Sequence, residues 1–369
     1  MAAPLTIPQT QTAVLVGWTE RKLTTVPVGK PGAGEVLIEN VAVASNPKDV
    51  KLPKILYKEG EAYVEGNDVA GTIVAVGEGV SEYELGARVA AFTKVGTKDN
   101  KYGAYQQYTV GTLTTTFPIP NAVSYEEAAT LPLALATAFI GLFPRLGIPA
   151  PDTPEAASNA GKAILIHSAA SSVGSYAVQL AKRAGLFVVA TAGASKDYAQ
   201  ELGADVVIDY RDHQGDSFIR TSADDFHFRV FRHDSHPTPW VYDAYSEKGS
   251  PLLLARALER IAKKNGESKF KAKITTVLPV PNEDYKQFPS GVEWERTSAG
   301  TVFNTDAEFA GPFYRKVSTW LADRSFKTNR PKIIPGGLAG VAKGLELLAK
   351  GVHGEKLVYQ IADTPGIGA

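Results

Sequence analysis

A hydrophobic run, a turn of small residues and a helical pattern follow one another near the middle of the chain. The run Ala163–His167 is apolar apart from its last residue, and the small residues Ser168–Ser172 come directly after it. Apolar residues then recur at helical spacing, and the pattern ends near Gly185; they are Val173, Ala177, Leu180 and Ala184. A second apolar run, Leu186–Thr191, follows at once. The pattern predicts a strand, a helix and a second strand, which together form a βαβ unit.

The turn of this βαβ unit has the composition of a phosphate-binding turn. A phosphate binds to backbone N–H groups at a helix N-terminus, and small residues let the backbone approach it closely. The glycine fingerprint of dinucleotide-binding proteins is reduced here to small residues, since only its last glycine, Gly174, is present. The turn therefore indicates a dinucleotide site, and a βαβ unit without a ligand stays open as the alternative.

Segments with strand character occupy the first third of the chain. Short β-rich runs punctuated by glycine lie within residues 12–120, for example at 35–44, 70–77 and 86–92. Several short strands at this spacing are typical of a compact, barrel-like β domain.

From about residue 124 the pattern changes to helices that alternate with strands. Beyond the first βαβ unit, strands are predicted at 205–209, 241–244 and 273–278. This alternation predicts a parallel sheet with helices on both faces. The stretches 212–240 and 279–304 lack a clear period, so we predict long loops there.

The last sixty residues return to a different character. Helices are predicted near 313–324 and around Leu338–Leu348, and the final run 356–361 alternates as a strand that could rejoin the β domain. The α/β domain is then an insertion within the sequence of the β domain. We predict one domain of residues 1–135 plus 305–369 and a second of residues 136–304, with a ligand-binding cleft between them.

Composition and charge exclude several kinds of partner. The 39 basic residues balance 39 acidic ones in 369 residues, so nothing favours nucleic acid or an anionic membrane. No basic residue precedes Arg21, and the uncharged stretch Ala128–Pro144 is interrupted by Pro132 and Gly141, which predicts a buried helix. The chain has no cysteine, so disulfides and thiolate zinc sites are excluded. We expect a cytoplasmic enzyme.

The segment after the second strand bears on the choice of cofactor. An NAD site usually places Asp or Glu about 20 residues after the glycine turn, where it binds the ribose 2′-OH. No carboxylate occurs here before Asp197, and a hydroxyl and a cation, Ser195 and Lys196, precede it. These groups suit a 2′-phosphate, so we predict NADPH as cofactor. An ordinary exposed loop lysine is the alternative for Lys196.

Nine short motifs occur in the order found in one enzyme family. They are Asn46–Asp49 (NPKD), Gly66–Gly71 (GNDVAG), Gly86–Val89, Gly103–Tyr108, Ala128–Pro132, Thr137–Ala138, Val173–Gly174, Leu202–Tyr210 and Gly354–Val358. With them the chain resembles the zinc-free quinone-oxidoreductase and enoyl-reductase branch of the medium-chain dehydrogenase/reductase superfamily. It is most similar to fungal trans-acting enoyl reductases. The resemblance implies an α/β fold in which a Rossmann doubly wound parallel sheet is inserted into a GroES-like β-barrel domain.

The residues at the family's zinc positions bear on the chemistry. Zinc members of this superfamily use cysteine and the histidine of a Gly-His-Glu motif, whereas this chain has no cysteine and has Asn67 in place of that histidine. We therefore expect no catalytic metal. Without a Lewis acid, alcohol dehydrogenation is disfavoured, and hydride transfer to an activated C=C or to a quinone stays open.

The resemblance assigns roles to individual residues. Lys51 takes the position of a lysine that contacts the cofactor and the reacting centre, and an ammonium group suits a developing oxyanion. Thr137 is the second catalytic candidate and, with Asn46, matches positions that contact the nicotinamide. The remaining predicted cofactor contacts are Pro47, Lys48, Asp49, Ser171, Ser172, Val173, Gly174, Ser195, Lys196 and Tyr210.

Each of these residues also has a structural interpretation. Lys51 could be a solvated surface lysine, Asn46 a turn residue before proline, and Thr137 a hydroxyl bonded to its own helix. Tyr210 could be an aromatic residue at the rim of the site. His167 is expected to be a buried structural residue, and the histidines at 227, 233 and 236 are expected in a solvated loop.

The function predicted from these observations is an NADPH-dependent reductase of an activated C=C bond, of enoyl or enone type, that works without zinc. The substrate is a small molecule or a carrier-bound acyl group, and the protein is a monomer or homodimer. Two alternatives stay open: a reductase of quinones or small carbonyls, and an NADPH-binding protein without turnover.

Overall fold

The computed structural model describes residues 6–212, 240–264, 266 and 270–367. The chain divides into two compact units, the first formed by Met1–Leu133 with Gly300–Ala369 and the second by Ala134–Ala299. The corresponding boundaries predicted from the sequence are 135/136 and 304/305. The three histidines at 227, 233 and 236 lie outside the described residues.

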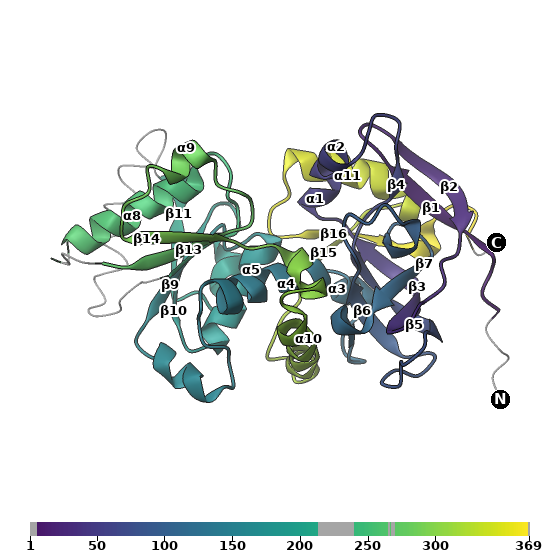
Figure 1. Ribbon diagram of the computed structural model, residues 1–369, viewed down its shortest axis with the longest axis horizontal. Helices are drawn as coiled ribbons and strands as arrows, with labels where there is room; N and C mark the ends of the chain where they lie inside the picture. Colours follow the sequence, from purple (N-terminus) through teal and green to yellow (C-terminus); the bar gives the residue numbers. More distant parts are fainter. Residues whose placement is uncertain (1–5, 213–239, 265, 267–269, 368–369) are drawn as a thin grey trace. The chain divides into compact units, whose positions relative to one another are not determined.

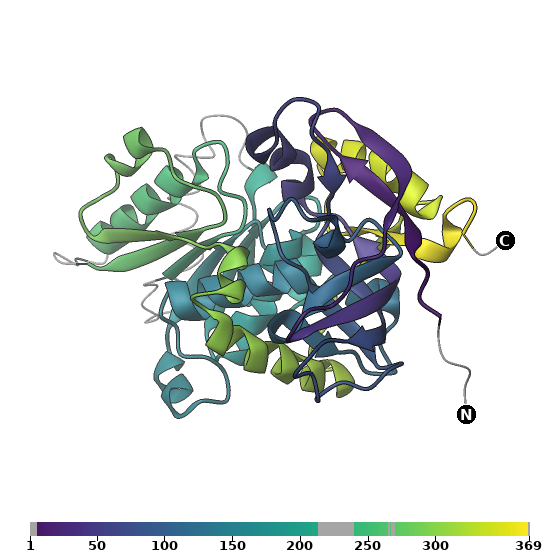
Figure 2. The ribbon, with the colours of Figure 1, turned by 45° about the vertical axis from the view of Figure 1, so that its right-hand side comes forward.

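The second unit is built on a six-stranded sheet whose neighbouring strands all run parallel. Figures 1 and 2 draw this sheet in teal and green. In spatial order the strands are β11 (Val206–Asp209), β10 (Phe187–Ala192), β9 (Ala163–His167), β12 (Trp240–Asp243), β13 (Ala272–Thr276) and β14 (Val292–Arg296). The first strand in sequence, β9, is central and the order reverses beside it, which is the order of the doubly wound dinucleotide-binding fold. The predicted Rossmann sheet is confirmed.

Burial on both faces explains why the central strands are continuously apolar. Every residue of β9 is buried. Leu165 of β9 and Val241 of β12 share a core cluster with Leu254 and Leu258 of α8 (Ser250–Lys264), so α8 covers one face of the sheet. The other helices of this unit are α4 (Pro132–Ile140), which begins in the first unit, α5 (Ser172–Arg183), α6 (Lys196–Glu201) and α9 (Asn282–Tyr285).

One predicted loop is wrong. The stretch 279–304 contains α9 and the edge strand β14, which pairs in parallel with β13 through Ile274 and Trp294. The sequence of β14 is Val-Glu-Trp-Glu-Arg, and Val292 is its only buried residue. An edge strand carries charged residues that prevent pairing with other chains, so the apolar signal used to predict strands is weak there.

The first unit contains two further sheets. A three-stranded sheet has the order β2-β1-β4, and a seven-stranded sheet has the order β15-β16-β3-β5-β6-β8, with β7 also paired to β3. The strands are β1 (Thr10–Val16), β2 (Arg21–Pro27), β3 (Glu35–Ala44), β4 (Tyr63–Val64), β5 (Asp68–Val76), β6 (Arg88–Phe92), β7 (Tyr108–Thr112), β8 (Thr116–Pro118), β15 (Pro331–Ile333) and β16 (Lys356–Gln360). Because β16 pairs antiparallel with β3, the end of the chain returns to the N-terminal sheet as predicted.

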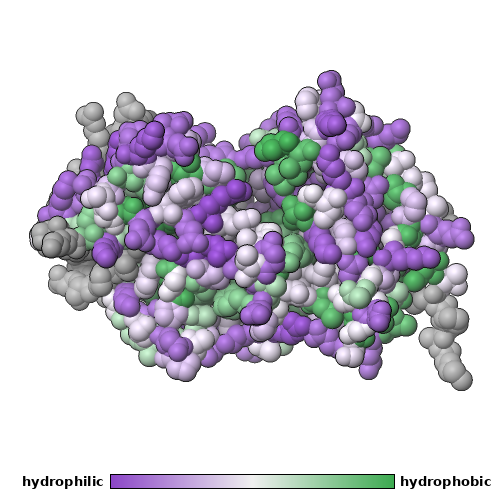
Figure 3. All heavy atoms as spheres, viewed as in Figure 1, coloured by the Kyte–Doolittle hydropathy of each residue, from purple (hydrophilic) through white to green (hydrophobic). Residues whose placement is uncertain are grey.

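Helices complete the first unit. They are α1 (Pro47–Lys51), α2 (Pro53–Leu56), α3 (Tyr125–Ala128), α10 (Ala307–Ala322) and α11 (Val341–Lys350). The apolar face of α11, with Val341 and Leu345, packs into a core cluster that also contains Ile38, Tyr105 and Tyr359. In Figure 3, charged and polar side chains cover much of the visible face, with apolar groups between them.

The apolar run Tyr125–Arg145 is long and hydrophobic enough to cross a membrane by composition alone. However, 83% of its most hydrophobic window is buried inside the protein. A core helix passes the same test of length and composition, and the burial matches the helix predicted to lie inside the fold.

The buried carboxylate of Glu35 joins the start of β3 to the neighbouring loops through hydrogen bonds and ion pairs. Glu35 accepts hydrogen bonds from the hydroxyl of Tyr102 at 2.6 Å, from Gly32 N–H at 3.0 Å and from Lys94 Nζ at 3.0 Å, and Lys101 Nζ lies 3.3 Å away. Burial raises the pKa of Glu35, but these four donors outweigh it and lower the pKa to about 2.

This shift makes part of the stability depend on pH. Because the pKa of Glu35 is depressed in the folded state, its contribution is complete above the unfolded value of 4.5 and is lost as the pH falls towards 2. We expect the stability advantage of the native protein over Glu35→Gln to shrink by about 1–2 kcal/mol over that range, after allowing for solvent screening of the lysines. Urea unfolding at several pH values measures it. A pH-independent difference would contradict the prediction, and Glu346→Gln, an exposed residue, is the control.

Candidate functional site

The turn between β9 and α5 has the geometry of a phosphate-binding turn. Ser171 caps α5, because its Oγ accepts the N–H of Gly174 at 3.1 Å. Ser168 adopts a positive φ of 59°, which sharpens the turn. A Cβ on Gly174 would lie 2.3 Å from the carbonyl oxygen of Ser168, so the last glycine of the fingerprint is required for the helix to approach the strand. Ser172 and Val173 lie in the first helical turn.

Buried polar groups support this turn from the neighbouring strand. His167 Nδ1 lies 2.7 Å from the hydroxyl of Thr191, and the carbonyl of Thr191 accepts the N–H of Ala169 at 2.9 Å. Burial lowers the pKa of His167, and the carboxylate of Asp243 opposes this only in part. His167 is therefore a neutral, buried residue that joins β9 to β10, as its sequence position predicts.

The carboxyl ends of β10 and β11 bring together the residues predicted near the cofactor's ribose. The ring of Tyr210 lies against Gly193, where an added Cβ would meet the Tyr210 hydroxyl at 2.4 Å. Ser195 and Lys196 begin α6, and half of the Lys196 side chain is exposed. Because parallel strands end at the same edge of a sheet, these residues and the β9–α5 turn share one edge.

Arg211 is a cation at this edge that the sequence reasoning missed. Its guanidinium binds the Asp209 carboxylate at 2.9 and 2.6 Å, and Lys196 Nζ lies 3.9 Å from the same carboxylate. The hydrogen bonds from Arg211 lower the pKa of Asp209 to about 2. The available signal was its place directly after Asp209-Tyr210 at the end of a predicted strand.

In the first unit, the predicted residues of the Asn-Pro-Lys-Asp motif form the start of α1. Asn46 is buried, and its amide donates to Asp68 Oδ2 at 2.8 Å and accepts from Lys356 Nζ at 2.5 Å. The backbone N–H of Asn46 donates to Asp49 Oδ2 at 2.8 Å, which closes the first turn of the helix. Pro47 takes the first helical position, where its missing N–H is not needed.

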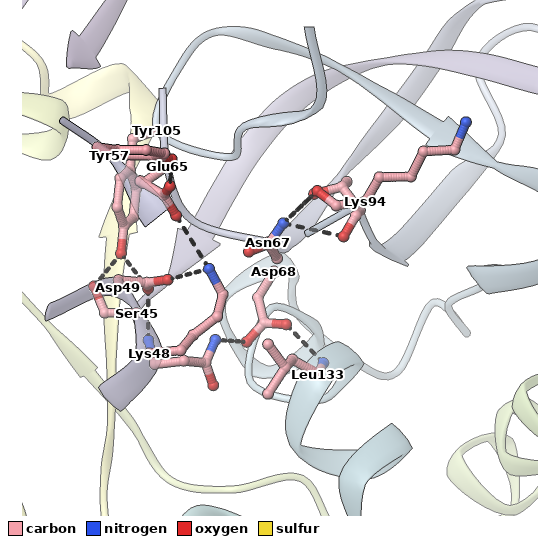
Figure 4. Close-up of polar contacts among 12 residues, drawn as sticks. Ser45, Lys48, Asp49, Tyr57, Glu65, Asn67, Asp68, Lys94, Tyr105 and Leu133 are labelled. Atoms are coloured by element: carbon pink, nitrogen blue, oxygen red, sulfur yellow. Dashed lines mark hydrogen bonds and ion pairs between the residues drawn. The ribbon is translucent and has the colours of Figure 1, made fainter. Parts of the chain in front are cut away.

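A second network surrounds Lys48, as Figure 4 shows. Its ammonium lies 2.6 Å from Asp49 Oδ1 and 3.2 Å from Glu65 Oε2, and the hydroxyl of Tyr57 donates to the other oxygen of Glu65. Burial lowers the pKa of Lys48, but the carboxylates of Asp49 and Glu65 outweigh it and raise the pKa. Lys48 is thus a fixed charge within the unit.

The other carboxylate oxygen of Asp49 is hydrogen-bonded to a chain of three hydroxyl groups. The hydroxyl of Tyr105 donates to Asp49 Oδ2 at 2.6 Å, and Ser45 Oγ lies 2.8 Å from that hydroxyl and 2.7 Å from the hydroxyl of Tyr359. Burial raises the pKa of Tyr105 well above 10, so it acts as a neutral donor. The chain links α1 to β16.

The two catalytic candidates lie in different surroundings. Lys51 is exposed at the last position of α1. Thr137 is buried on α4, and its carbonyl oxygen accepts a hydrogen bond from the Tyr242 hydroxyl at 2.6 Å. The structure therefore gathers Asn46, Pro47, Lys48, Asp49 and Lys51 in the first unit, and the nucleotide-side candidates at one sheet edge of the second.

Asn67 is the residue at which the resemblance implies a zinc-binding histidine in zinc members of the superfamily. It is buried, and its amide N–H groups donate to the carbonyl oxygens of Thr93 at 3.0 Å and Lys94 at 2.9 Å (Figure 4). These two acceptors fix the orientation of the amide. Within the described residues, no group of three or more His, Cys, Asp or Glu side chains could hold a metal ion.

Comparison with known proteins assigns this arrangement to a family. Residues 32–121 match the alcohol dehydrogenase GroES-like domain. The chain is 30% identical over 320 residues to the trans-enoyl reductase fsr4 of Gibberella fujikuroi, covering 85% of this chain and 87% of that protein. The chain belongs to the medium-chain dehydrogenase/reductase superfamily.

Other members of the superfamily are similar over most of their length. A zinc-type alcohol dehydrogenase-like protein of Schizosaccharomyces pombe is 32% identical over 335 residues, covering 89% of this chain and 92% of that one. The CurK enoyl reductase structure matches with a TM-score of 0.73 at 22% identity, covering 96% and 99% of the two chains. The crotonyl-CoA carboxylase/reductase AntE in complex with NADP matches at 0.72 and 17% identity, covering 99% and 98%.

Membership explains the two units. The residues that match the GroES-like domain, 32–121, contain β3 to β8 of the first unit, and the doubly wound sheet forms the second. The chain is accordingly an oxidoreductase of this superfamily, and its fold is suited to a nicotinamide cofactor.

The close approach at Gly174 can be tested directly. In Gly174→Ala the new Cβ would press on the backbone at Ser168, so either the turn or the helix must shift. We expect a loss of about 1–3 kcal/mol in the free energy of unfolding, measured with urea. Gly311→Ala is the control, because its nearest contact would be the flexible end of Arg315, at 3.2 Å, and the next, the carbonyl oxygen of Thr114 at 3.5 Å, is an ordinary van der Waals contact. Equal stabilities of the two variants would contradict this account of the turn.

Proposed function

We propose that this member of the superfamily is an NADPH-dependent reductase of an activated C=C bond, of enoyl or enone type, and that it works without a catalytic zinc. The observation that carries the proposal is the combination of a phosphate-binding turn, two cations at the next strand ends and an exposed lysine on α1. Its similarity to a protein named as a trans-enoyl reductase supports the substrate class.

The residues at the sheet edge fit a dinucleotide phosphate. The N-terminus of α5, with Ser172 and Val173 in its first turn, presents backbone N–H groups, and Gly174 leaves the space that a Cβ would fill. When bound, NADPH supplies the hydride for the reduction. The protein's part is to bind the phosphates and to fix the orientation of the nucleotide.

The same edge favours a 2′-phosphate over the plain ribose of NADH. Lys196 and Arg211 supply two positive charges, and Ser195 supplies a hydroxyl. Asp209 is a carboxylate at the end of β11 beside them. Both of its oxygens are bound by Arg211 and its pKa is lowered to about 2, so it is engaged as a counter-ion and not as a ribose ligand.

The preference can be measured with single variants. We expect Lys196→Ala and Arg211→Ala each to raise the KM for NADPH by about 10–100-fold, since each removes a charge-assisted contact worth about 1.5–3 kcal/mol. The KM for NADH should stay unchanged. Lys263→Ala, which removes an exposed lysine of α8, is the control. A parallel loss with NADH, or equal use of both cofactors by the native protein, would refute the 2′-phosphate assignment.

Lys51 is proposed to stabilise the charge that develops on the substrate. Addition of hydride to the β-carbon of an α,β-unsaturated carbonyl places negative charge on the carbonyl oxygen, and a positioned ammonium lowers the energy of that oxyanion. Thr137, Asn46, Pro47, Lys48 and Asp49 are the remaining proposed residues on the nicotinamide side.

Zinc is proposed to have no part in the reaction, although one relative is named as zinc-type. The chain has no cysteine to supply thiolate ligands. Asn67, at the family's histidine position, offers a neutral amide oxygen in place of an imidazole nitrogen, and zinc sites in proteins use thiolate, imidazole and carboxylate ligands. The residues present therefore do not fit the superfamily's catalytic zinc site.

Removal of the Lys51 charge tests its role. We expect Lys51→Met to lower kcat by about 100-fold with little change in the KM for NADPH, which is the usual cost of losing one donor to an oxyanion. Lys54→Met is a matched control, because Lys54 is another exposed lysine close by on α2. Full activity of Lys51→Met, or an equal loss in Lys54→Met, would remove the assigned role.

The substrate class is tested by following NADPH oxidation with an enal, an enone, an enoyl thioester and a quinone. Turnover of the first three supports the proposal, and turnover of the quinone alone favours the alternative reductase. Tight NADPH binding without turnover of any of them would indicate a cofactor-binding protein. A carrier-bound acyl group is included among the thioesters, because the proposed substrate is either small or carrier-bound.

A further inference from the structure

We propose that Lys356 is a positioning residue whose buried ammonium sets the start of α1 and thereby the place of Lys51. Its predicted effect on turnover rests on the proposed function of Lys51, whereas its effect on α1 does not. Lys356 lies in the Gly354–Val358 motif, which neither the cofactor site nor the proposed chemistry uses.

The ammonium lies inside a closed triangle of polar groups. Lys356 on β16 is only 4% exposed, and its Nζ lies 2.5 Å from Asn46 Oδ1 and 3.0 Å from Asp68 Oδ2. The third side is the hydrogen bond from the Asn46 amide to Asp68 Oδ2, at 2.8 Å. The remaining oxygen of Asp68 accepts the N–H of Leu133 at 2.7 Å, in the first turn of α4.

This triangle fixes the orientation of the Asn46 amide. Its oxygen faces an ammonium and its nitrogen faces a carboxylate, so a rotated amide would bring donor to donor and acceptor to acceptor. Both ends of the amide are thus directed into the protein, and Asn46 is 3% exposed. Asn46 thereby anchors the start of α1, a role separate from the nicotinamide contact proposed above.

The anchor matters because α1 cannot hold its own position. It has five residues, fewer than an isolated helix needs to be stable. Its first turn depends on Asn46, whose N–H donates to Asp49 Oδ2 and whose carbonyl accepts the N–H of Asp49 at 2.9 Å. Lys51 is at the end of this short helix, so the direction in which the helix leaves Asn46 determines where its ammonium lies.

A buried ion pair is weak evidence for stability alone. Well-packed apolar residues of similar volume are often as stable as a buried pair, whereas removal of one partner leaves an uncompensated charge and is strongly destabilising. A positioning role accounts for the retention of the pair here, because apolar residues could not orient the Asn46 amide.

The test uses a double variant in which both charged side chains of the buried pair are replaced by neutral ones. Lys356→Met/Asp68→Asn removes both charges, so neither is left buried alone, and Lys356→Met serves for comparison. We expect kcat of the double variant to fall at least tenfold with the KM for NADPH within about twofold of the native value. Hydrogen exchange of the backbone amides of residues 48–52 should become at least tenfold faster, while the exchange of β9 is unchanged.

The control is Lys332→Met. Lys332 lies on the neighbouring strand β15 and pairs with Glu355, but the two side chains are 47% and 40% exposed, so neither kcat nor exchange in α1 should change. Native kcat in the double variant would overturn the proposal, and so would a fall in kcat without faster exchange in α1. If the native protein reduces no unsaturated substrate, the proposed function fails, and the exchange measurement alone then decides whether Lys356 positions α1.

Discussion

The buried carboxylate of Asp68 is the constraint on which the candidate site of the first unit depends. A carboxylate with no exposure is tolerated only if donors surround it, since an unpaired buried charge costs several kcal/mol. Three donors meet it here, from Asn46, Lys356 and the backbone of Leu133. They come from segments far apart in the chain, so satisfying one charge determines where the C-terminal strand, α1 and the first turn of α4 lie.

The strands and helices that the sequence predicts well are those whose local pattern matches their final surroundings. Continuous burial of Ala163–His167 gives an apolar run, and the small residues after it are required by the approach of Gly174 to Ser168. The edge strand Val292–Arg296 is not predicted from the sequence, because one of its faces is polar and an edge strand carries charged residues that prevent pairing with other chains. Local sequence specifies a central parallel strand more strongly than an edge strand.

The residues of the candidate site also fall into two groups, those that the local sequence predicts and those that it does not. The phosphate-binding turn is local, so its residues could be named from their order along the chain. The partners of Asn46 could not, because Lys356 is 310 residues away and only the return of β16 to β3 brings it near. Arg211 was missed for a different reason, since its role depends on the carboxylate of Asp209 being engaged, which spacing does not reveal.

The two lysines of α1 show how burial separates residues of one type. Lys48 lies between Asp49 and Glu65, and because their charges outweigh its desolvation its pKa is raised. An ammonium with a raised pKa is a poor proton donor, so Lys48 suits a fixed charge better than an acid. Lys51 is one turn further on and exposed, where an ammonium can meet a substrate. Because α1 is too short to be stable alone, the buried charged groups at its start hold it in place, and this fixes the position of the Lys51 ammonium at its end. The buried network and the proposed chemistry therefore depend on each other.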